Sequence, residues 1–507
     1  MDKGCLEIKD LSFSYPSWSG FEAKEIFSGL TLEVSPGEIG VVFGRPESGK
    51  STLALIIAAL IPLHTGGEIS GRVMLDDKNT LKTEPADFIE NCGIVFQDPE
   101  KQTVTTECFT EAAFALESLG IKEQEIINRV ESAFDKLGVR HLLNSPVAET
   151  SGGEKKKLAL AGLISVKPDL WILDETIEEL DNPSRIALLK LLRESGKTIL
   201  IFSSKYFKAF SDADAFFLLK DGEISDRESY PFKQEFRKKL ITEGVIPDFN
   251  DYKRDENTVH DSERGLLLKA ENLRYSYEGG SFELSVDSFR LAEQETVSIV
   301  GRNGCGKSTL ARMLCGLAEP RTGRIFAADG AAGISIDEPV DSVLLNSFCA
   351  YMFQNPDYQI FLPTVFDELS WGLKEAGYSS KVIKARVEAA IADFRLPNAS
   401  TPPAMMSFSA RKRLQAAVYY LLKRPVFILD EADTGLSFPD FIDLTVKLKQ
   451  NCRGLIIITH NLELASVASD RVLGMSGGRL YEDILDYSPE KLNEWLTDSA
   501  ERDEEGL

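Results

Sequence analysis

The 507-residue sequence lacks an apolar run long enough to span a bilayer, which takes roughly 20 residues. Its most apolar stretch, LALIIAALIPL at 53–63, is too short for this, and we expect it to form a buried helix. The first ten residues, MDKGCLEIKD, also lack the apolar stretch of a signal peptide. We therefore expect any role at a membrane to depend on a partner protein.

The sequence also lacks closely spaced cysteine pairs and an excess of basic over acidic residues. The seven cysteines are scattered without a CxxC pair, so we expect no zinc or iron–sulfur site and a reducing cytoplasm. The chain has 80 Asp and Glu against 57 Lys and Arg, a net charge of −23, which argues against a nucleic-acid partner because phosphate backbones bind clustered cations. A hydrophobic content of 43% still supports ordinary buried cores.

The chain repeats itself at long range. Lys50 and Lys307 lie in GRPESGKSTL and GRNGCGKSTL, 257 residues apart. VFQDPEKQ and MFQNPDYQ recur at the same offset, whereas DLWILDE and PVFILDE, like TSGGEKKK and MSFSARKR, recur at 256. A nearly constant offset indicates two whole domains in tandem, because the period is too long for a solenoid.

The breaks between these motifs define four segments. We expect the first domain at 1–230 and the second at 266–490. Residues 231–265 are polar and lack apolar periodicity over most of their length, which predicts a linker. Residues 491–507 are acidic and are predicted to be a disordered tail.

Each half contains GxxxxGK[ST] between an apolar strand and a helix, the pattern of a P-loop. Its glycines let backbone N–H groups wrap phosphates, its lysine reaches the outer phosphates, and its serine holds Mg²⁺. The predicted ATP-binding residues are Gly44, Gly49, Lys50, Ser51 and Thr52 in the first half, and Gly301, Asn303, Gly304, Gly306, Lys307, Ser308 and Thr309 in the second.

A second element of phosphate chemistry is an apolar strand that ends in two acids. We expect Asp174 and Asp430 to support Mg²⁺, and Glu175 and Glu431 to polarise an attacking water. Phosphoryl transfer to water needs a metal, a positioned water and charge stabilisation rather than covalent chemistry, and these residues could supply them.

With TSGGEKKK ahead of the first acidic strand, the chain resembles the ATP-binding cassette (ABC) family over nearly its full length. The resemblance implies an α/β fold of two P-loop cassettes, each with a mixed β-sheet core and a helical signature subdomain. It also implies that they pair head-to-tail within one chain, so that each ATP lies between the P-loop of one half and the signature of the other. The implied signature contacts are Ser151, Gly152, Gly153 and Glu154.

The family resemblance implies further roles. Tyr15 and Tyr277 would stack on adenine, His460 would contact the γ-phosphate, and Asp181 would cross the interface. Gln97 and Gln354 would touch Mg²⁺ and the water. The implied metal set is Ser51, Gln97, Asp174, Ser308, Gln354 and Asp430, and the implied catalytic set is Glu431, His460, Gln354 and Glu175.

The two halves differ at several of these positions. Phe408 and Ser409 replace the signature glycines, Ala410 replaces the glutamate, and Ser437 replaces Asp181. In the first half, Ser204 stands where the second has His460, and Glu47 stands where it has Gly304. Under head-to-tail pairing all these losses fall on the site of the first P-loop. We therefore expect the second P-loop site to hydrolyse ATP and the first to bind it with little turnover.

The segment FQNPDYQIFLPTVFDELSWGLKEAG at 353–377 resembles the ATPases of energy-coupling-factor importers of vitamins and metal ions. The resemblance implies a transmembrane energy-coupling subunit and a small membrane substrate-binding subunit as partners, at the cytoplasmic face of the cell membrane. The residues expected to grip the transmembrane partner are Tyr358, Phe361, Leu362 and Phe366.

Two other functions stay open on the sequence. A tandem sugar-importer ATPase has a similar length, although the 353–377 segment speaks against it. A ribosome-binding translation-factor ATPase shares the tandem layout, although such proteins usually carry two intact signatures and a basic linker. A DNA-repair or chromosome-structural ATPase is disfavoured because the chain lacks a zinc insertion or a long coiled coil.

Overall fold

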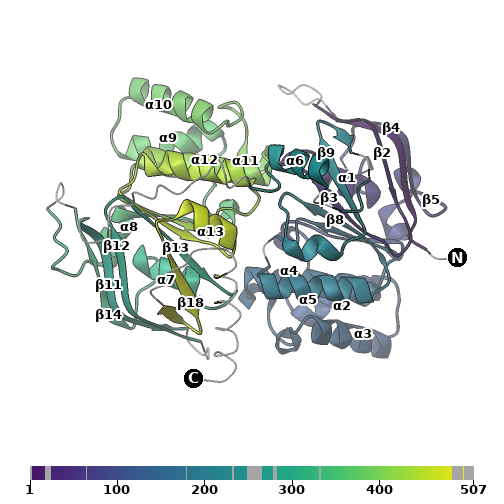
Figure 1. Cartoon of the computed structure of the whole chain (residues 1–507), viewed down its shortest axis with the longest axis horizontal. Coiled ribbons are helices and arrows are strands. Elements are labelled where there is room, and N and C mark those ends of the chain that lie inside the picture. Colours follow the sequence, from purple (N-terminus) through teal and green to yellow (C-terminus); the bar gives the residue numbers. More distant parts are fainter. Residues whose placement is uncertain are drawn as a thin grey trace. The chain divides into compact units, whose positions relative to one another are not determined.

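A computed structural model describes residues 3–16, 24–63, 65–178, 180–225, 227–230, 233–247, 265–277, 282–329 and 333–481, with Lys491 and Trp495. The chain divides into two compact units, Met1–Pro247 and Asp248–Leu507 (Figure 1). Most of the predicted linker and almost all of the predicted tail lie outside the described residues. In the described residues no helix is long and apolar enough to cross a membrane.

The first unit contains an antiparallel sheet and a largely parallel one. The antiparallel sheet has the order β2-β1-β4-β5, and its strands are β1 (Leu6–Tyr15), β2 (Lys24–Val34), β4 (Glu68–Leu75) and β5 (Lys78–Asn79). The second sheet has the order β10-β9-β3-β8-β7-β6. Its strands are β3 (Ile39–Phe43), β6 (Cys92–Val95), β7 (Leu170–Asp174), β8 (Thr198–Ser203), β9 (Ala215–Lys220) and β10 (Glu223–Ile224).

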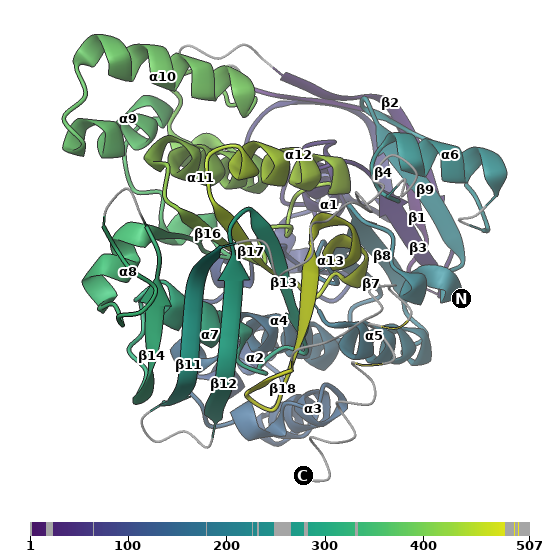
Figure 2. The ribbon, with the colours of Figure 1, turned by 60° about the vertical axis from the view of Figure 1, so that its left-hand side comes forward.

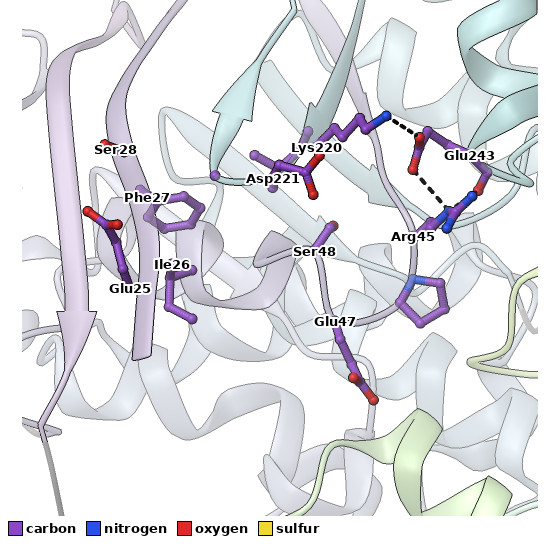
Figure 3. A pocket seen from close by; sticks show the side chains of 13 residues that line it. Glu25, Ile26, Phe27, Ser28, Arg45, Glu47, Ser48, Lys220, Asp221 and Glu243 are labelled. Atoms are coloured by element: carbon purple, nitrogen blue, oxygen red, sulfur yellow. Dashed lines mark hydrogen bonds and ion pairs between the residues drawn. The ribbon is translucent and has the colours of Figure 1, made fainter. Parts of the chain in front are cut away.

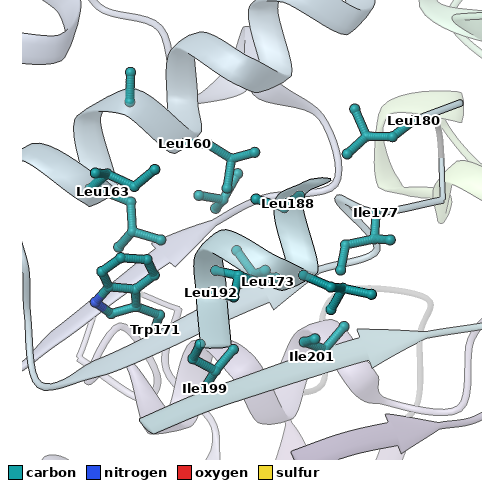
Figure 4. Packing of buried hydrophobic residues seen from close by; sticks show 14 of the residues in the cluster. Leu160, Leu163, Trp171, Leu173, Ile177, Leu180, Leu188, Leu192, Ile199 and Ile201 are labelled. Atoms are coloured by element: carbon teal, nitrogen blue, oxygen red, sulfur yellow. The ribbon is translucent and has the colours of Figure 1, made fainter. Parts of the chain in front are cut away.

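The core strands of this largely parallel sheet are mostly apolar because helices cover both of its faces. β3, β7 and β8 are buried along their whole length and pair in parallel. On one face, Trp171, Leu173 and Ile199 pack against leucines of α4 (Gly152–Val166) and α5 (Asn182–Glu194), as Figure 4 shows. On the other face lies α1 (Lys50–Ile57). The predicted apolar helix at 53–63 is helical only as far as Ile57, and residues 58–63 lie outside any helix.

Three helices form a helical subdomain in the first unit: α2 (Cys108–Ser118), α3 (Glu123–Lys136) and α4. A fourth helix, α6 (Gln234–Thr242), lies in the stretch that the sequence assigns to the linker. Its Phe236 and Leu240 are buried in the core of this unit, so residues 234–242 pack as part of the first unit.

The second unit repeats this plan in one continuous sheet of order β14-β11-β12-β19-β18-β13-β17-β16-β15. Figure 2 shows its antiparallel part, β14, β11 and β12, side by side. The strands are β11 (Leu266–Ser276), β12 (Glu283–Ala292), β13 (Glu295–Gly301), β14 (Thr322–Ala327), β15 (Cys349–Met352), β16 (Val426–Asp430), β17 (Gly454–Ile458), β18 (Arg471–Ser476) and β19 (Arg479–Tyr481).

The second unit contains counterparts of α1 to α5 in the same order, together with the short helices α8 and α13. They are α7 (Lys307–Leu314), α8 (Ser342–Phe348), α9 (Val365–Glu375), α10 (Ser380–Asp393), α11 (Phe408–Leu422), α12 (Phe438–Lys449) and α13 (Leu462–Ala468). α9, α10 and α11 pack together as the helical subdomain. The α/β fold of two tandem cassettes is thus confirmed.

Candidate functional site

The two P-loops have the same local structure. Each follows a buried strand and opens a helix whose first residue is the P-loop lysine. The Lys50 ammonium donates to the carbonyl oxygens of Gly44 and Arg45, both at 2.8 Å, and Lys307 donates to those of Gly301 and Arg302, both at 2.9 Å. Both ammonium groups therefore lie inside the loop. Phosphate oxygens could replace the carbonyl oxygens as their hydrogen-bond acceptors.

A glycine is required immediately before each of these lysines. Gly49 has φ 102° and Gly306 has φ 106°, in the left-handed region that favours glycine. A Cβ at Gly306 would also come within 2.7 Å of Phe282. The backbone can thus turn tightly into the helix, whose N-terminal N–H groups attract anions.

Each acidic strand brings the predicted catalytic glutamate beside the predicted glutamine. The Gln97 amide donates to Glu175 at 2.7 Å, and the Gln354 amide donates to Glu431 at 2.8 Å. Lys50 also forms an ion pair with Glu175 at 3.1 Å. P-loop, glutamine and glutamate therefore meet within each unit, although they are far apart in sequence.

The residues beside each P-loop serine could hold Mg²⁺. The Ser308 hydroxyl donates to Asp430 at 3.0 Å, and Ser51 bonds Asp174 in the same way. Asp174 Oδ1 is buried without a hydrogen-bond partner among the described residues. Hydroxyl, amide and carboxylate oxygens are the ligands that Mg²⁺ prefers. Burial raises the pKa of both aspartates, and a bound cation would oppose that rise.

The strand that follows ends differently in the two units. In the second, His460 Nδ1 lies 3.7 Å from Glu431 Oε1. Burial alone would raise the pKa of Glu431, but His460 and Lys307 hold it below the ordinary value. Glu431 is therefore ionised at neutral pH and able to accept a proton. In the first unit Ser204 occupies the position of the histidine.

In the first unit, the carboxylate of Glu178 lies beside Ser203 and Ser204. The sequence motifs did not predict a role for Glu178. It accepts hydrogen bonds from the Ser203 hydroxyl at 3.0 Å, the Ser204 hydroxyl at 2.9 Å and the Ser204 N–H at 2.5 Å. Burial, followed by the charge of Glu175, raises its pKa. Only one signal could have revealed it, an acid where the second half has Thr434.

The predicted adenine contacts lie beside the P-loop helices. The Tyr15 hydroxyl is 3.1 Å from that of Thr52, and the Tyr277 hydroxyl is 3.0 Å from that of Thr309. Tyr277 is 45% exposed, so its ring is accessible to a flat ligand. Stacking on adenine stays a prediction.

Both signature segments open a helix, but the two helices have different caps. Ser151 caps α4 in a capping box, in which it accepts from the Glu154 N–H and Glu154 accepts from the Ser151 N–H. Ser407 caps α11 by accepting from the Ala410 N–H at 3.1 Å, and Ala410 offers no carboxylate in return.

The remaining predicted positions also lie at helix starts. Gly152 and Gly153 begin α4, whereas the half-buried Phe408 and the buried Ser409 begin α11. Asp181 and Ser437 are the N-caps of α5 and α12. None of these contacts requires a nucleotide, so their roles as ATP contacts stay predictions.

A cavity of about 390 Å³ lies against the first P-loop. Arg45, Glu47 and Ser48 line it, and Lys50 and Glu175 do not. Figure 3 shows the Glu47 carboxylate pointing away from the ion pairs that Arg45 and Lys220 form with Glu243, both at 2.9 Å. Glu47 is exposed and has φ 68°, a conformation that Gly304 adopts without strain in the second unit.

Comparisons with known proteins agree with this geometry. The profile of a family described as "ABC transporter" matches residues 27–178 and 284–434. A Methanosarcina acetivorans protein and a Clostridium perfringens protein, both of whose names describe ABC transporter ATP-binding proteins, are 28% and 27% identical. Each match covers 90% of the relative, and 94% and 95% of this chain respectively.

A solved structure shows the same fold over almost the whole chain. It is the complex of the archaeal ribosomal stalk protein aP1 with the archaeal ribosome recycling factor aABCE1. The TM-score is 0.60 at 18% identity, and the match covers 96% of this chain and 92% of the other. An identity this low indicates a shared fold and nothing more about activity.

Proposed function

The chain belongs to the ABC transporter family and is an ATPase, and we propose that it drives an importer of the energy-coupling-factor type. In this proposal it hydrolyses ATP at the cytoplasmic face of the membrane and powers uptake of a vitamin or metal ion through a separate transmembrane subunit. A small membrane protein would bind the substrate.

One observation carries the importer proposal, an apolar surface beside α9. Tyr358 is 60% exposed, Phe361 73% and Trp371 51%, all within the segment 353–377. Leu362 and Phe366 of the same segment are half-buried. Several exposed large apolar side chains within one short segment are typical of a docking site, and a transmembrane partner would cover them.

The first unit has a more polar counterpart of this surface. Lys101 and Thr105 stand at the positions of Tyr358 and Leu362, whereas Val104, at the position of Phe361, is 64% exposed. In the proposal both units contact the transmembrane subunit, and the second makes the more apolar contact.

The chemistry is assigned to the second P-loop. Lys307 would bind the outer phosphates and Glu431, ionised and held by Gln354, would accept the proton of the attacking water. Mg²⁺, held by Ser308, Asp430 and Gln354, would stabilise charge on the phosphates. His460 would donate a hydrogen bond to the transferring phosphoryl group.

We further propose head-to-tail pairing of the two cassettes within one chain. Ser151, Gly152 and Gly153 at the start of α4 would then complete the second P-loop site, because a helix N-terminus favours an anion. Phe408 would stand at the corresponding place in the first site, where a bulky ring keeps the backbone away from phosphate. Nucleotide would bind there with little turnover.

Co-purification tests the importer proposal. The tagged full chain, extracted from its own cells with mild detergent, is expected to carry a multi-spanning membrane protein. Tyr358→Ser together with Phe361→Ser should lose that protein and keep the ATPase rate of the isolated chain. Val343→Ser, a substitution at another exposed apolar residue, is the control. Recovery with ribosomes and with no transmembrane protein would overturn the proposal and favour the translation-factor class.

A further inference from the structure

Asp430 of the second unit is held by two hydroxyl groups on its two oxygens. Ser308 donates to Oδ1 at 3.0 Å, and the Tyr351 hydroxyl donates to Oδ2. Asp430 and Tyr351 are both 4% exposed, so neither bond competes with bulk water. Two bonds on opposite oxygens fix the plane of the carboxylate, because neither oxygen can rotate without breaking one of them.

Arg312 extends this contact. It hydrogen-bonds the Tyr351 hydroxyl. The Tyr351 hydroxyl therefore has the guanidinium of Arg312 and the carboxylate of Asp430 as its two partners. Because an arginine side chain has donors and no acceptor, Tyr351 accepts from Arg312 and donates to Asp430.

The backbone of Tyr351 is also held by Gln359 and by α11 of the helical subdomain. Its carbonyl oxygen accepts from the Gln359 amide at 2.9 Å and from the Tyr419 hydroxyl of α11. Gln359 in turn accepts from the Phe353 N–H at 3.2 Å. These bonds fix the end of β15, and with it the position from which the tyrosine reaches Asp430.

The first unit lacks the side chains of this arrangement. Ile94, Leu55 and Leu163 stand at the positions of Tyr351, Arg312 and Tyr419. The backbone bond is kept, since the Gln102 amide donates to the Ile94 carbonyl oxygen at 2.9 Å. No hydroxyl can reach Asp174 from Ile94, and Asp174 Oδ1 is buried without a hydrogen-bond partner in the described part of the chain.

We propose that Tyr351 is a positioning residue that holds Asp430 Oδ2 and so presents Oδ1, beside Ser308, to the metal ion of the nucleotide. The inference rests on the proposed role of Asp430 in binding Mg²⁺. It follows that the second unit holds the divalent cation more tightly than the first, for a reason separate from the signature and histidine differences. Residues behind metal ligands commonly change metal affinity by about 10–100-fold.

The test measures metal binding rather than turnover. In the full chain with Lys50→Ala to silence the first site, Mn²⁺ is titrated by electron paramagnetic resonance in the presence of a non-hydrolysable ATP analogue. Tyr351→Phe should weaken Mn²⁺ binding about tenfold. In EDTA, Tyr351→Phe should bind the analogue with the affinity of the parent. The control Tyr420→Phe should bind Mn²⁺ with the affinity of the parent.

Arg312→Gln is a second variant that tests the same contact if Tyr351→Phe is poorly folded. It should weaken Mn²⁺ binding by a smaller factor, because the tyrosine remains. Equal Mn²⁺ affinity of parent and Tyr351→Phe would overturn the inference and leave the metal site of the second unit intact. A parent that binds the analogue but no Mn²⁺ would overturn both the inference and the proposed metal role of Asp430.

Discussion

The two cassettes differ at the end of the strand that follows the acidic strand in the sheet, β17 in the second unit and β8 in the first. In the second, the Thr459 hydroxyl donates to Asp433 at 3.1 Å, and His460 faces Glu431. In the first, Glu178 reaches the loop and bonds both Ser203 and Ser204. Loss of the histidine in the first cassette is therefore accompanied by a buried carboxylate that ties down the loop.

The loop after β8 in the first cassette is therefore held by hydrogen bonds that the second cassette lacks. Glu178 is 4% exposed, and three donors satisfy it. Because Ser204 stands in place of the histidine, this loop has no imidazole to donate to a phosphate. The experiments below compare the two cassettes, from the largest expected effect to the smallest.

The largest contrast is expected from the two glutamates. Glu431→Gln should lower the steady-state ATPase rate by about 10³-fold, because a general base contributes about 10²–10⁴-fold. Glu175→Gln should leave most of the rate. Phosphate release by the full chain measures both, and the assignment of the sites would be reversed if only Glu175→Gln abolished turnover.

A smaller loss is expected at the strand end. His460→Ala should lower kcat by about 10²-fold, since one donor to a developing charge is worth about that much. The matched change in the first cassette, Ser204→Ala, should leave kcat unaltered because the serine faces Glu178. A similar fall in both variants would show that the two cassettes are catalytically equivalent.

Glu178 should make the stability of the chain depend on pH. Its pKa is raised in the folded state, so its contribution to the free energy of unfolding falls as pH rises through that raised pKa. Glu178→Gln should therefore raise Tm at pH 8, by about 2–4 °C for a gain of about 1 kcal/mol.

Scanning fluorimetry of the nucleotide-free chain tests this. The gain should shrink as the pH falls towards the raised pKa of the wild-type carboxyl, because the protonated side chain is then neutral, like glutamine. Glu149→Gln, a change at an exposed glutamate, should shift Tm little over the same pH range. A lower Tm for Glu178→Gln at pH 8 would contradict the expected sign.

The smallest difference is expected at the two signature caps. Ser151→Ala removes a capping box and should cost about 1 kcal/mol of unfolding free energy, whereas Ser407→Ala removes an N-cap without a capping box and should cost about 0.5 kcal/mol. Urea unfolding of the nucleotide-free chain measures both. A larger cost at Ser407 would mean that Phe408 and its neighbours depend on the cap more than the glycines do.

The P-loops could be read from the sequence because their function is local. Between Gly44 and Ser51 the chain turns once and starts a helix, so a short spacing encodes the whole cradle. The signature segments are equally local, each being a helix start. The beginning of the linker was harder to place, because Phe236 and Leu240 of α6 show their burial only against the core of the first unit.

The sequence by itself determined that there are two cassettes, which residues form each P-loop and acidic strand, and at which positions the halves differ. Only the tertiary structure decided that Glu178 meets Ser204, and that Tyr351 meets Asp430 across 79 residues. The reason is physical. A buried carboxylate accepts from whichever donors the folded core brings within hydrogen-bond distance, and that distance cannot be derived from motif spacing or residue type.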